Sequence, residues 1–257
     1  GALEEKIDGG TRAVLLCNPG NPTGTVYTEE EIRGVADIAR RRDLFIISDE
    51  VYREFRFDGV PFFSPMHLPQ AADRVIVTDS VSKRYSSCGA RIGFLASRNR
   101  EVMQAVLKFA MARLSPPSLG QVLAEREFGL DFSYFDRVIA EYQARRDILF
   151  EELSRSGIMT PSRPEGAFYM IVKLKGVDSE DFARFLLTDF GIDNETVMVA
   201  PAPGFYATGG LGTDEIRLAY VLNTDKTRRA ARILREGAAA YLDLLQRKPG
   251  LLYTGGS

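Results

Sequence analysis

A strand–helix–strand pattern near the start of the chain constrains the fold most strongly. Ala13 to Cys17 form a short apolar run that predicts a strand buried on both faces. Thr28 and Glu31 have the spacing of a capping box at the start of an amphipathic helix. A second apolar run, Leu44 to Ile47, follows this helix. Because a helix that connects two buried strands makes them parallel, the pattern predicts an α/β fold with a parallel sheet.

Polar side chains follow three predicted strands where these strands end. The first strand runs into a turn at 18–24 that is rich in proline and glycine, and a third strand is predicted at Val75 to Val77. The carboxyl ends of parallel strands meet at one edge of the sheet, and open α/β sheets bind ligands there. We therefore expect a ligand site at this edge. The side chains expected to converge on it are Asn21, Asp49, Tyr52, Ser80 and Lys83.

Lys83 is predicted to lie in a loop of small polar residues directly after the third strand. A lysine that is partly desolvated or close to other cations can supply a nucleophilic amine. The hydroxyls of Ser80 and Ser82 and the guanidinium of Arg91 are groups that suit a phosphate. Taken by itself the stretch fits a solvated surface loop better than a catalytic site, so a catalytic role for Lys83 depends on the rest of the chain.

Composition excludes several functional classes. The formal net charge of −2 gives no indication of nucleic-acid binding or of an anionic membrane surface. No apolar run approaches the length of a membrane span, and no secretory signal is recognisable. Cys17 and Cys88 are too few for a disulfide framework, which favours a reducing compartment and a cytoplasmic location. The single histidine, His67, argues against a histidine-based triad or a multi-histidine metal site.

The second half of the chain has a different pattern. A strand at Ile92 to Ala96 follows the Lys83 loop too closely for a crossover, so we expect it to be antiparallel. A long helix at Phe132 to Ser156 is expected to link two domains, with Arg145, Arg146, Glu151 and Glu152 on a solvated face. Beyond Pro161, short strands mixed with helices predict a smaller α+β domain. The other expected helices are Glu101–Arg113, Ser118–Phe128, Ser179–Asp189 and Thr224–Gln246, and the other strands are Ala167–Val172, Val197–Ala200 and Ile216–Val221.

Four motifs follow one another in a characteristic order. They are Asn18-Pro19-Gly20-Asn21-Pro22-Thr23-Gly24, Ser48-Asp49-Glu50-Val51-Tyr52, Ser80-Val81-Ser82-Lys83 with Arg91-Ile92-Gly93-Phe94, and Glu215-Ile216-Arg217-Leu218. In this order they resemble the class I/II aminotransferases, pyridoxal-phosphate enzymes of the aspartate aminotransferase fold. The resemblance extends from Ala13 to the last helix. It implies the C-terminal part of the large, cofactor-binding domain with a mostly parallel sheet, followed by a smaller α+β C-terminal domain.

The resemblance also implies domain boundaries and a missing part. Residues 1–144 would be the remnant of the cofactor-binding domain, 145–250 the small domain and 251–257 a tail. Family members have a further region before the first motif, with the first strands of the large sheet, the phosphate-cradling loop and an aromatic residue that stacks on the cofactor ring. We expect this chain to be N-terminally truncated, and an inactive truncated chain stays open as an alternative.

Carried over by resemblance, Lys83 is the residue that forms a Schiff base with pyridoxal 5′-phosphate and later moves the proton at the substrate Cα. Asp49 is expected to pair with the pyridine nitrogen, and Tyr52 and Asn21 to donate to the phenolic oxygen of the ring. Ser80 and Arg91 match phosphate ligands. Arg217 matches the arginine that binds the substrate α-carboxylate, and Asn21 is also expected beside the substrate.

The activity that the resemblance implies is transamination between an amino acid and a 2-oxo acid. The form of the lysine motif favours aspartate and 2-oxoglutarate weakly. A carbon–sulfur β-lyase or a decarboxylase of the same fold stays open as an alternative. So does the cofactor-sensing domain of a transcription regulator, although no basic or helix-turn-helix-like segment is seen here. Family sites borrow residues from a neighbouring subunit, which implies a homodimer.

Overall fold

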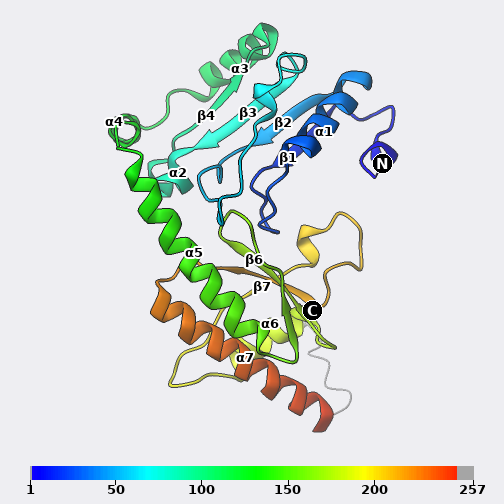
Figure 1. Cartoon of the computed structure of the whole chain (residues 1–257), viewed down its shortest axis with the longest axis vertical. Coiled ribbons are helices and arrows are strands. Elements are labelled where there is room, and N and C mark those ends of the chain that lie inside the picture. The colour runs from blue at the N-terminus through cyan, green and yellow to red at the C-terminus, as the bar shows by residue number, and fades with distance from the viewer. Residues whose placement is uncertain (1, 248–257) are drawn as a thin grey trace. The chain divides into compact units, whose positions relative to one another are not determined.

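The computed structural model describes residues 2–247 and divides them into two compact units (Figure 1). The first unit contains residues up to 21, 25–137 and 165–167, and the second contains 22–24, 138–164 and the residues from 168 onward. Each unit has its own four-stranded sheet. The boundary expected after residue 144 stays a prediction, and the expected tail at 251–257 lies outside the described residues.

The first unit is built on a mostly parallel sheet with the order β1-β2-β3-β4 (Figure 1). The strands are β1 (Ala13–Cys17), β2 (Phe45–Asp49), β3 (Val75–Ser80) and β4 (Gly93–Ser97). β1, β2 and β3 are parallel, and β4 is antiparallel to β3. This confirms the strand–helix–strand prediction and the antiparallel direction of the fourth strand.

The helices of this unit are α1 (Glu29–Arg41), α2 (Val81–Arg84), α3 (Arg100–Arg113) and α4 (Ser118–Phe128), with short 3-10 turns at Glu4–Lys6, Pro65–His67 and Cys88–Ala90.

Helix α1 begins with the predicted capping box. The Thr28 side chain accepts a hydrogen bond from the Glu31 backbone N–H, and the Glu31 carboxylate accepts one from the Thr28 backbone N–H at 2.8 Å. The apolar face of the helix buries Ile32, Ala36 and Ala39 in a core that includes side chains from β1, β2 and β3. This packing places the helix on one face of the sheet and leaves the carboxyl edge of the strands accessible.

Strand β1 departs from the prediction that it is buried on both faces. Val14 and Leu16 are buried in the core, whereas the side chain of Leu15 is 70% exposed. Successive side chains of a strand point to opposite faces, and α1 covers only the face that carries Val14 and Leu16. Within residues 2–247, β1 therefore has one buried face and one exposed face.

The second unit is an antiparallel sheet covered by helices. Its strands, in the order β5-β6-β8-β7, are β5 (Met159–Pro161), β6 (Tyr169–Leu174), β8 (Glu215–Ala219) and β7 (Ala200–Pro201). Its helices are α5 (Ser133–Ser154), of which residues 133–137 belong to the first unit, α6 (Ser179–Thr188) and α7 (Thr224–Arg247), with a 3-10 turn at Pro203–Phe205. Helices α6 and α7 pack through Phe182, Phe185 and Tyr241, whose ring centroids lie 5.0 to 5.9 Å apart across the two helices.

Two predictions for this unit were wrong. The strand expected at Val197–Ala200 is reduced to Ala200–Pro201, because residues 197–199 line a cavity beside α7 instead of pairing with β8. Arg146, expected on a solvated face of the long helix, is fully buried. Its guanidinium donates hydrogen bonds to the carbonyl oxygen of Pro164 at 3.0 Å and to the Asp147 carboxylate at 2.9 Å. A buried guanidinium is stable only with such partners, and helical periodicity does not reveal them.

Candidate functional site

The ends of the three parallel strands lie in register at one edge of the first sheet (Figure 1). Cys17 at the end of β1 pairs with Asp49 at the end of β2, and Asp49 pairs in turn with Thr78 of β3. Main-chain hydrogen bonds continue past the strands, since the Asn18 N–H donates to Asp49 O at 3.0 Å and the Glu50 N–H to Thr78 O at 2.9 Å. The loops after all three strands therefore begin at neighbouring positions that are fixed by main-chain hydrogen bonds.

The turn after β1 presents Asn21 at the surface. Asn18 is buried, and its Oδ1 accepts a hydrogen bond from the Tyr27 N–H at 3.0 Å. The Gly20 N–H donates to Thr25 O at 2.8 Å and closes the turn between them. Asn21 lies inside this closed turn with an exposed side chain. The motif thus uses its first asparagine for structure and leaves the second accessible.

Asp49 is the last residue of β2, and Tyr52 lies in the turn that follows the strand. Asp49 is half-buried, and its Oδ1 accepts a hydrogen bond from the Val51 N–H at 3.2 Å. A carboxylate has a second acceptor oxygen, so Oδ2 can accept a hydrogen bond from a ligand. Tyr52 is buried, with 4% of its surface exposed, in the turn that follows. A carboxylate and a phenol are therefore held within one short turn.

Lys83 lies in a short helix, which corrects the prediction of a loop. Ser80 is both the last residue of β3 and the N-cap of α2, where its Oγ accepts a hydrogen bond from the Ser82 N–H at 3.0 Å. The Ser80 Oγ also lies 2.7 Å from the carbonyl oxygen of Ile92, to which it can donate. Because Ser80 caps the helix, α2 begins directly at the end of β3. Lys83, which is half-buried, therefore lies in an ordered helical turn.

Arg91 reaches the same edge because β4 returns antiparallel to β3. Ser80 pairs with Gly93 in the ladder, and Arg91 precedes Gly93 by two residues. The Arg91 backbone has a φ of 56°, and its exposed side chain donates from Nη1 to the carbonyl oxygen of Cys88 at 2.8 Å. Gly120 of α4 supports this turn, since a Cβ at Gly120 would lie 2.4 Å from the Ala90 carbonyl oxygen.

Arg217 lies in β8 of the second unit and is described there by itself. Its guanidinium carbon lies 4.7 Å from the ring centroid of Tyr169 and 4.6 Å from that of Phe205. Two aromatic faces therefore hold the plane of the guanidinium by cation–π contact. The two rings therefore orient the N–H donors of the guanidinium, and bidentate binding of a carboxylate requires such an orientation.

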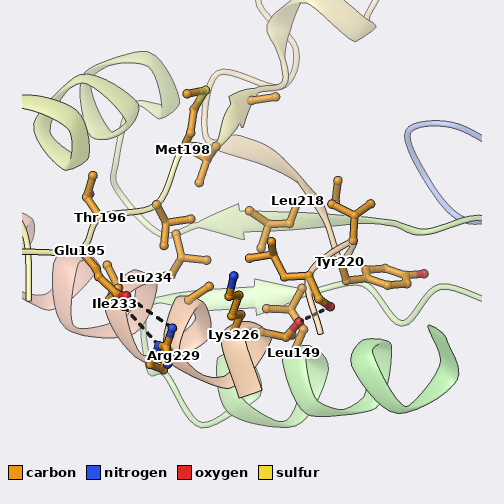
Figure 2. Close-up of a pocket in the computed structure, with 18 of the residues that line it drawn as sticks. Leu149, Glu195, Thr196, Met198, Leu218, Tyr220, Lys226, Arg229, Ile233 and Leu234 are labelled. Carbon is orange, nitrogen blue, oxygen red and sulfur yellow. Dashed lines mark hydrogen bonds and ion pairs between the residues drawn. The ribbon is translucent and has the colours of Figure 1, made fainter. Parts of the chain in front are cut away.

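A cavity of about 650 Å³ in the second unit was not predicted from the sequence (Figure 2). It lies between β8, helix α7 and residues 195–200, and its walls are mostly apolar, including Met198, Leu218 and Ile233. The Arg229 guanidinium forms an ion pair with Glu195 at 3.2 Å. Arg217 and Leu218 of the fourth motif contribute to its lining, but the other segments, which include Leu149 and residues 195–200, carry no motif that would have indicated a cavity.

Residues 2–247 give little support for a metal site, a nucleophilic cysteine or a membrane-spanning helix. No group of three or more His, Cys, Asp or Glu side chains is arranged to hold a metal ion. Burial raises the pKa of the Cys17 thiol, which keeps this sulfur protonated near neutral pH and argues against a nucleophilic role. None of the helices in this part of the chain is both long and apolar enough to cross a membrane.

The comparisons with known proteins identify the family. The family profile described as "Aminotransferase class I and II" matches residues 1–234. The chain therefore belongs to the class I and II aminotransferases, which are pyridoxal-phosphate-dependent enzymes. This confirms the resemblance inferred from the four motifs, and the α/β fold with a mostly parallel sheet agrees with it.

Individual relatives are longer than this chain. It is 32% identical over 232 residues to the putative aminotransferase YugH of Bacillus subtilis, covering 89% of this chain and 57% of the relative. It is 30% identical over 243 residues to the aspartate aminotransferase of Pyrococcus abyssi, covering 91% and 60%. LysN, an α-aminoadipate aminotransferase from Thermus thermophilus solved with N-(5′-phosphopyridoxyl)-L-leucine, has a TM-score of 0.82 and 27% identity, covering 95% and 63%. The chain thus spans less than two thirds of each.

The side chains at the sheet edge fit the chemistry of pyridoxal phosphate. The edge carries an amine on Lys83, hydroxyls on Ser80 and Ser82, a guanidinium on Arg91, and a half-buried carboxylate on Asp49 with one oxygen accessible to a ligand. A pyridinium nitrogen, an aldehyde and a phosphate each have a complementary partner in this set. The donor set of the first unit is therefore suitable for this cofactor.

Proposed function

We propose that this chain carries the cofactor-binding edge and the substrate-binding arginine of an enzyme that transfers an amino group from an amino acid to a 2-oxo acid. The observation that carries the proposal is the alignment of the ends of β1, β2 and β3, which brings Asn21, Asp49 and Lys83 to one edge of the sheet. Bound pyridoxal phosphate supplies an electron sink for the electron pair left when an amino acid loses its Cα proton.

The residues of the chain have separate roles in this proposal. The Lys83 amine tethers the cofactor and carries the proton to and from the substrate Cα. The Asp49 carboxylate keeps the pyridine nitrogen protonated by a charge-assisted hydrogen bond, which strengthens the electron sink. Tyr52 and Asn21 donate to the phenolic oxygen of the ring. Each of these groups acts from the end of a strand, so the sheet sets their spacing.

Phosphate and substrate are bound by other side chains. Ser80 and Arg91, at the ends of the hairpin between β3 and β4, bind the phosphate group with a hydroxyl and a guanidinium. Arg217 binds the substrate α-carboxylate, supported by its two aromatic neighbours. Asn21 completes the substrate side of the site.

We favour aspartate as amino donor and 2-oxoglutarate as acceptor, on the form of the lysine motif and on the aspartate aminotransferase among the relatives. The name of LysN shows that α-aminoadipate is a substrate elsewhere on this fold. We also propose that the enzyme is a cytoplasmic homodimer. These assignments concern the whole enzyme, of which this chain spans a part.

The proposal is tested by an absorption spectrum of the purified chain with added pyridoxal phosphate. We expect a visible band that is absent in Lys83→Ala, bleaches with aspartate and returns with 2-oxoglutarate while glutamate accumulates. Release of ammonia with loss of the amino-acid side chain would indicate a lyase instead. Identical spectra of the wild type and Lys83→Ala would contradict the role of Lys83.

A further inference from the structure

A set of charged side chains alternates along the sequence with the candidate cofactor residues. In the turn after β2, Glu50, Arg53 and Glu54 are interspersed with Asp49 and Tyr52. At the end of β3, Asp79 and Arg84 flank the stretch that contains Ser80 and Lys83. These five charged residues all belong to the first unit and form one set of neighbouring ion pairs.

Asp79 and Arg84 form a buried ion pair across the junction of β3 and α2. Only 5% of Asp79 and 7% of Arg84 is exposed. Arg84 Nη2 donates a hydrogen bond to Asp79 Oδ2, and Asp79 Oδ1 accepts one from the Ser80 N–H at 2.7 Å. The pair therefore encloses residues 80–83 and ties the last residue of α2 to the strand from which the helix starts.

Arg53 connects this pair to the turn after β2. Its Nη2 lies 3.5 Å from Asp79 Oδ2 and its Nη1 lies 3.7 Å from Glu50 Oε2. Arg84 makes a second connection, with its Nε 3.6 Å from Glu54 Oε1. The two guanidinium groups thus link the loop of Asp49 and Tyr52 to the helix of Lys83.

Glu50 anchors the far end of the set. Only 1% of this residue is exposed, and its Oε1 accepts hydrogen bonds from the hydroxyls of Ser48 at 3.0 Å and Ser64 at 2.6 Å. Anchored buried charges hold one geometry, because any movement would leave a charge without a partner in a region of low dielectric. The set is therefore a rigid connection at the candidate site.

We infer that Asp79 and Arg84 are positioning residues for Lys83. A helix of four residues is too short to be stable by itself, since helix nucleation is unfavourable. The single turn of α2 is closed by few hydrogen bonds, among them that of the Ser80 cap and the Tyr85 N–H to Val81 O bond, 3.1 Å long. The ion pair supplies the missing constraint and fixes the direction in which Lys83 leaves the backbone. Arg53 then sets this helix relative to Asp49 and Tyr52. The role of Lys83 in this inference rests on the proposed function.

The first measurement is hydrogen exchange, which needs no cofactor. In Asp79→Asn/Arg84→Met both charges are removed, so no unpaired charge is buried and the global stability recovers relative to Arg84→Met. We expect the amides of Tyr85 and Ser86, whose acceptors are Val81 O and Lys83 O, to exchange about tenfold faster in the double variant. The control is Glu29→Gln/Arg33→Met, which removes an exposed ion pair of α1. Unchanged exchange at Tyr85 and Ser86 would overturn the inference.

The second measurement is reductive labelling of lysines with pyridoxal phosphate and cyanoborohydride, located by peptide mass. Wild-type protein should label Lys83 faster than the exposed Lys175. The double variant should lose this preference by about tenfold, and Arg84→Lys should recover part of it, because an ammonium can pair with Asp79 without the second contact to Glu54.

The outcomes separate the two proposals. A wild type that labels Lys83 no faster than Lys175 contradicts the proposed function, and the exchange rates then decide the positioning role by themselves. A double variant that keeps the Lys83 preference overturns the positioning role even where exchange is faster, because the ion pair would then be structural only.

Discussion

The guanidinium of Arg217 lies between the rings of Tyr169 and Phe205, 4.7 and 4.6 Å from their centroids. Tyr169 is on the neighbouring strand β6 and Phe205 is in the 3-10 turn after β7, so the second unit itself builds the slot. A planar guanidinium fits between two aromatic faces, whereas a lysine ammonium does not orient itself in this way.

Arg217→Lys should therefore weaken substrate binding although it keeps the charge. We expect the KM for the amino donor to rise about tenfold or more, with a smaller change in kcat, because a single ammonium cannot make the bidentate contact to a carboxylate. Steady-state kinetics with aspartate checks this. Arg229→Lys is the matched control, because Arg229 lines the same cavity but is paired with Glu195, and it should leave KM unchanged. Equal KM values for Arg217→Lys and the wild type would contradict a carboxylate-binding role.

Glu50→Gln should change how stability depends on pH. Burial raises the pKa of Glu50 above its ordinary value of 4.5, so the folded state retains a proton that the unfolded chain releases. This group therefore stabilises the fold below the unfolded-state pKa, and the contribution is lost as pH rises through the folded-state pKa. We expect the free energy of unfolding of the wild type to fall relative to Glu50→Gln as the pH rises above about 4.5 and through the raised pKa of the folded state.

Denaturant titrations at several pH values measure this difference. Glutamine retains an acceptor for the hydroxyls of Ser48 and Ser64, so the change is confined to the ionisable group. The exposed Glu30→Gln is the control and should show no such divergence. A difference between Glu50→Gln and the wild type that stays constant over this range would disprove the assignment.

Arg146→Met should be destabilising, because it leaves the Pro164 carbonyl oxygen without this donor and removes one of the two arginine partners of the Asp147 carboxylate. A buried acceptor that loses its donor costs about 1 to 3 kcal/mol. Chemical denaturation followed by circular dichroism measures the loss. Arg155→Met removes the exposed ion pair with Glu152 and should cost less than about 1 kcal/mol. Similar losses in both variants would mean that burial of Arg146 is not what stabilises this unit.

Two glycine-to-alanine substitutions in helices should have opposite effects. At Gly120 the new Cβ would lie 2.4 Å from the Ala90 carbonyl oxygen, so the turn before Arg91 must shift at a cost of about 1 to 3 kcal/mol. At Gly34 of α1 nothing lies within 4 Å, and alanine should stabilise the helix by up to about 1 kcal/mol. Thermal unfolding of the two variants checks the signs. A stabilising Gly120→Ala would show that α4 does not support the Arg91 turn.

Local signals in the sequence predicted much of the first unit. The capping box of Thr28 and Glu31 sets the start of α1, and the short connection before Ile92 required an antiparallel strand. Both features depend on neighbours within a few residues, so they can be recognised without the fold. The same reasoning brought the candidate residues from Asn21 to Lys83 to one edge of the sheet, because strand direction alone decides on which side a strand ends.

Features that depend on distant partners could not be predicted. Arg146 has the same kind of helical context as Arg145, and its burial involves the Pro164 carbonyl oxygen, which lies 18 residues later in the sequence. Likewise, Asp79 and Arg84 are ordinary charges in the sequence, and their burial depends on Arg53 and Glu54 from another loop. The exposed Leu15 was missed because an apolar run does not state how many faces are covered.

The hairpin between β3 and β4 has a consequence for how this site tolerates changes in length. Ser80 and Gly93 face each other in the ladder, so the two ends of the connecting segment are fixed by strand pairing. Residues inserted near Ser86, between α2 and the 3-10 turn Cys88–Ala90, would extend a connection whose ends do not move, and lengthening a surface loop costs little entropy. Deletions or insertions within either strand would shift the register and turn side chains to the opposite face. Evolution and engineering can therefore lengthen the tip of this hairpin, while the residues on its two strands must keep their spacing.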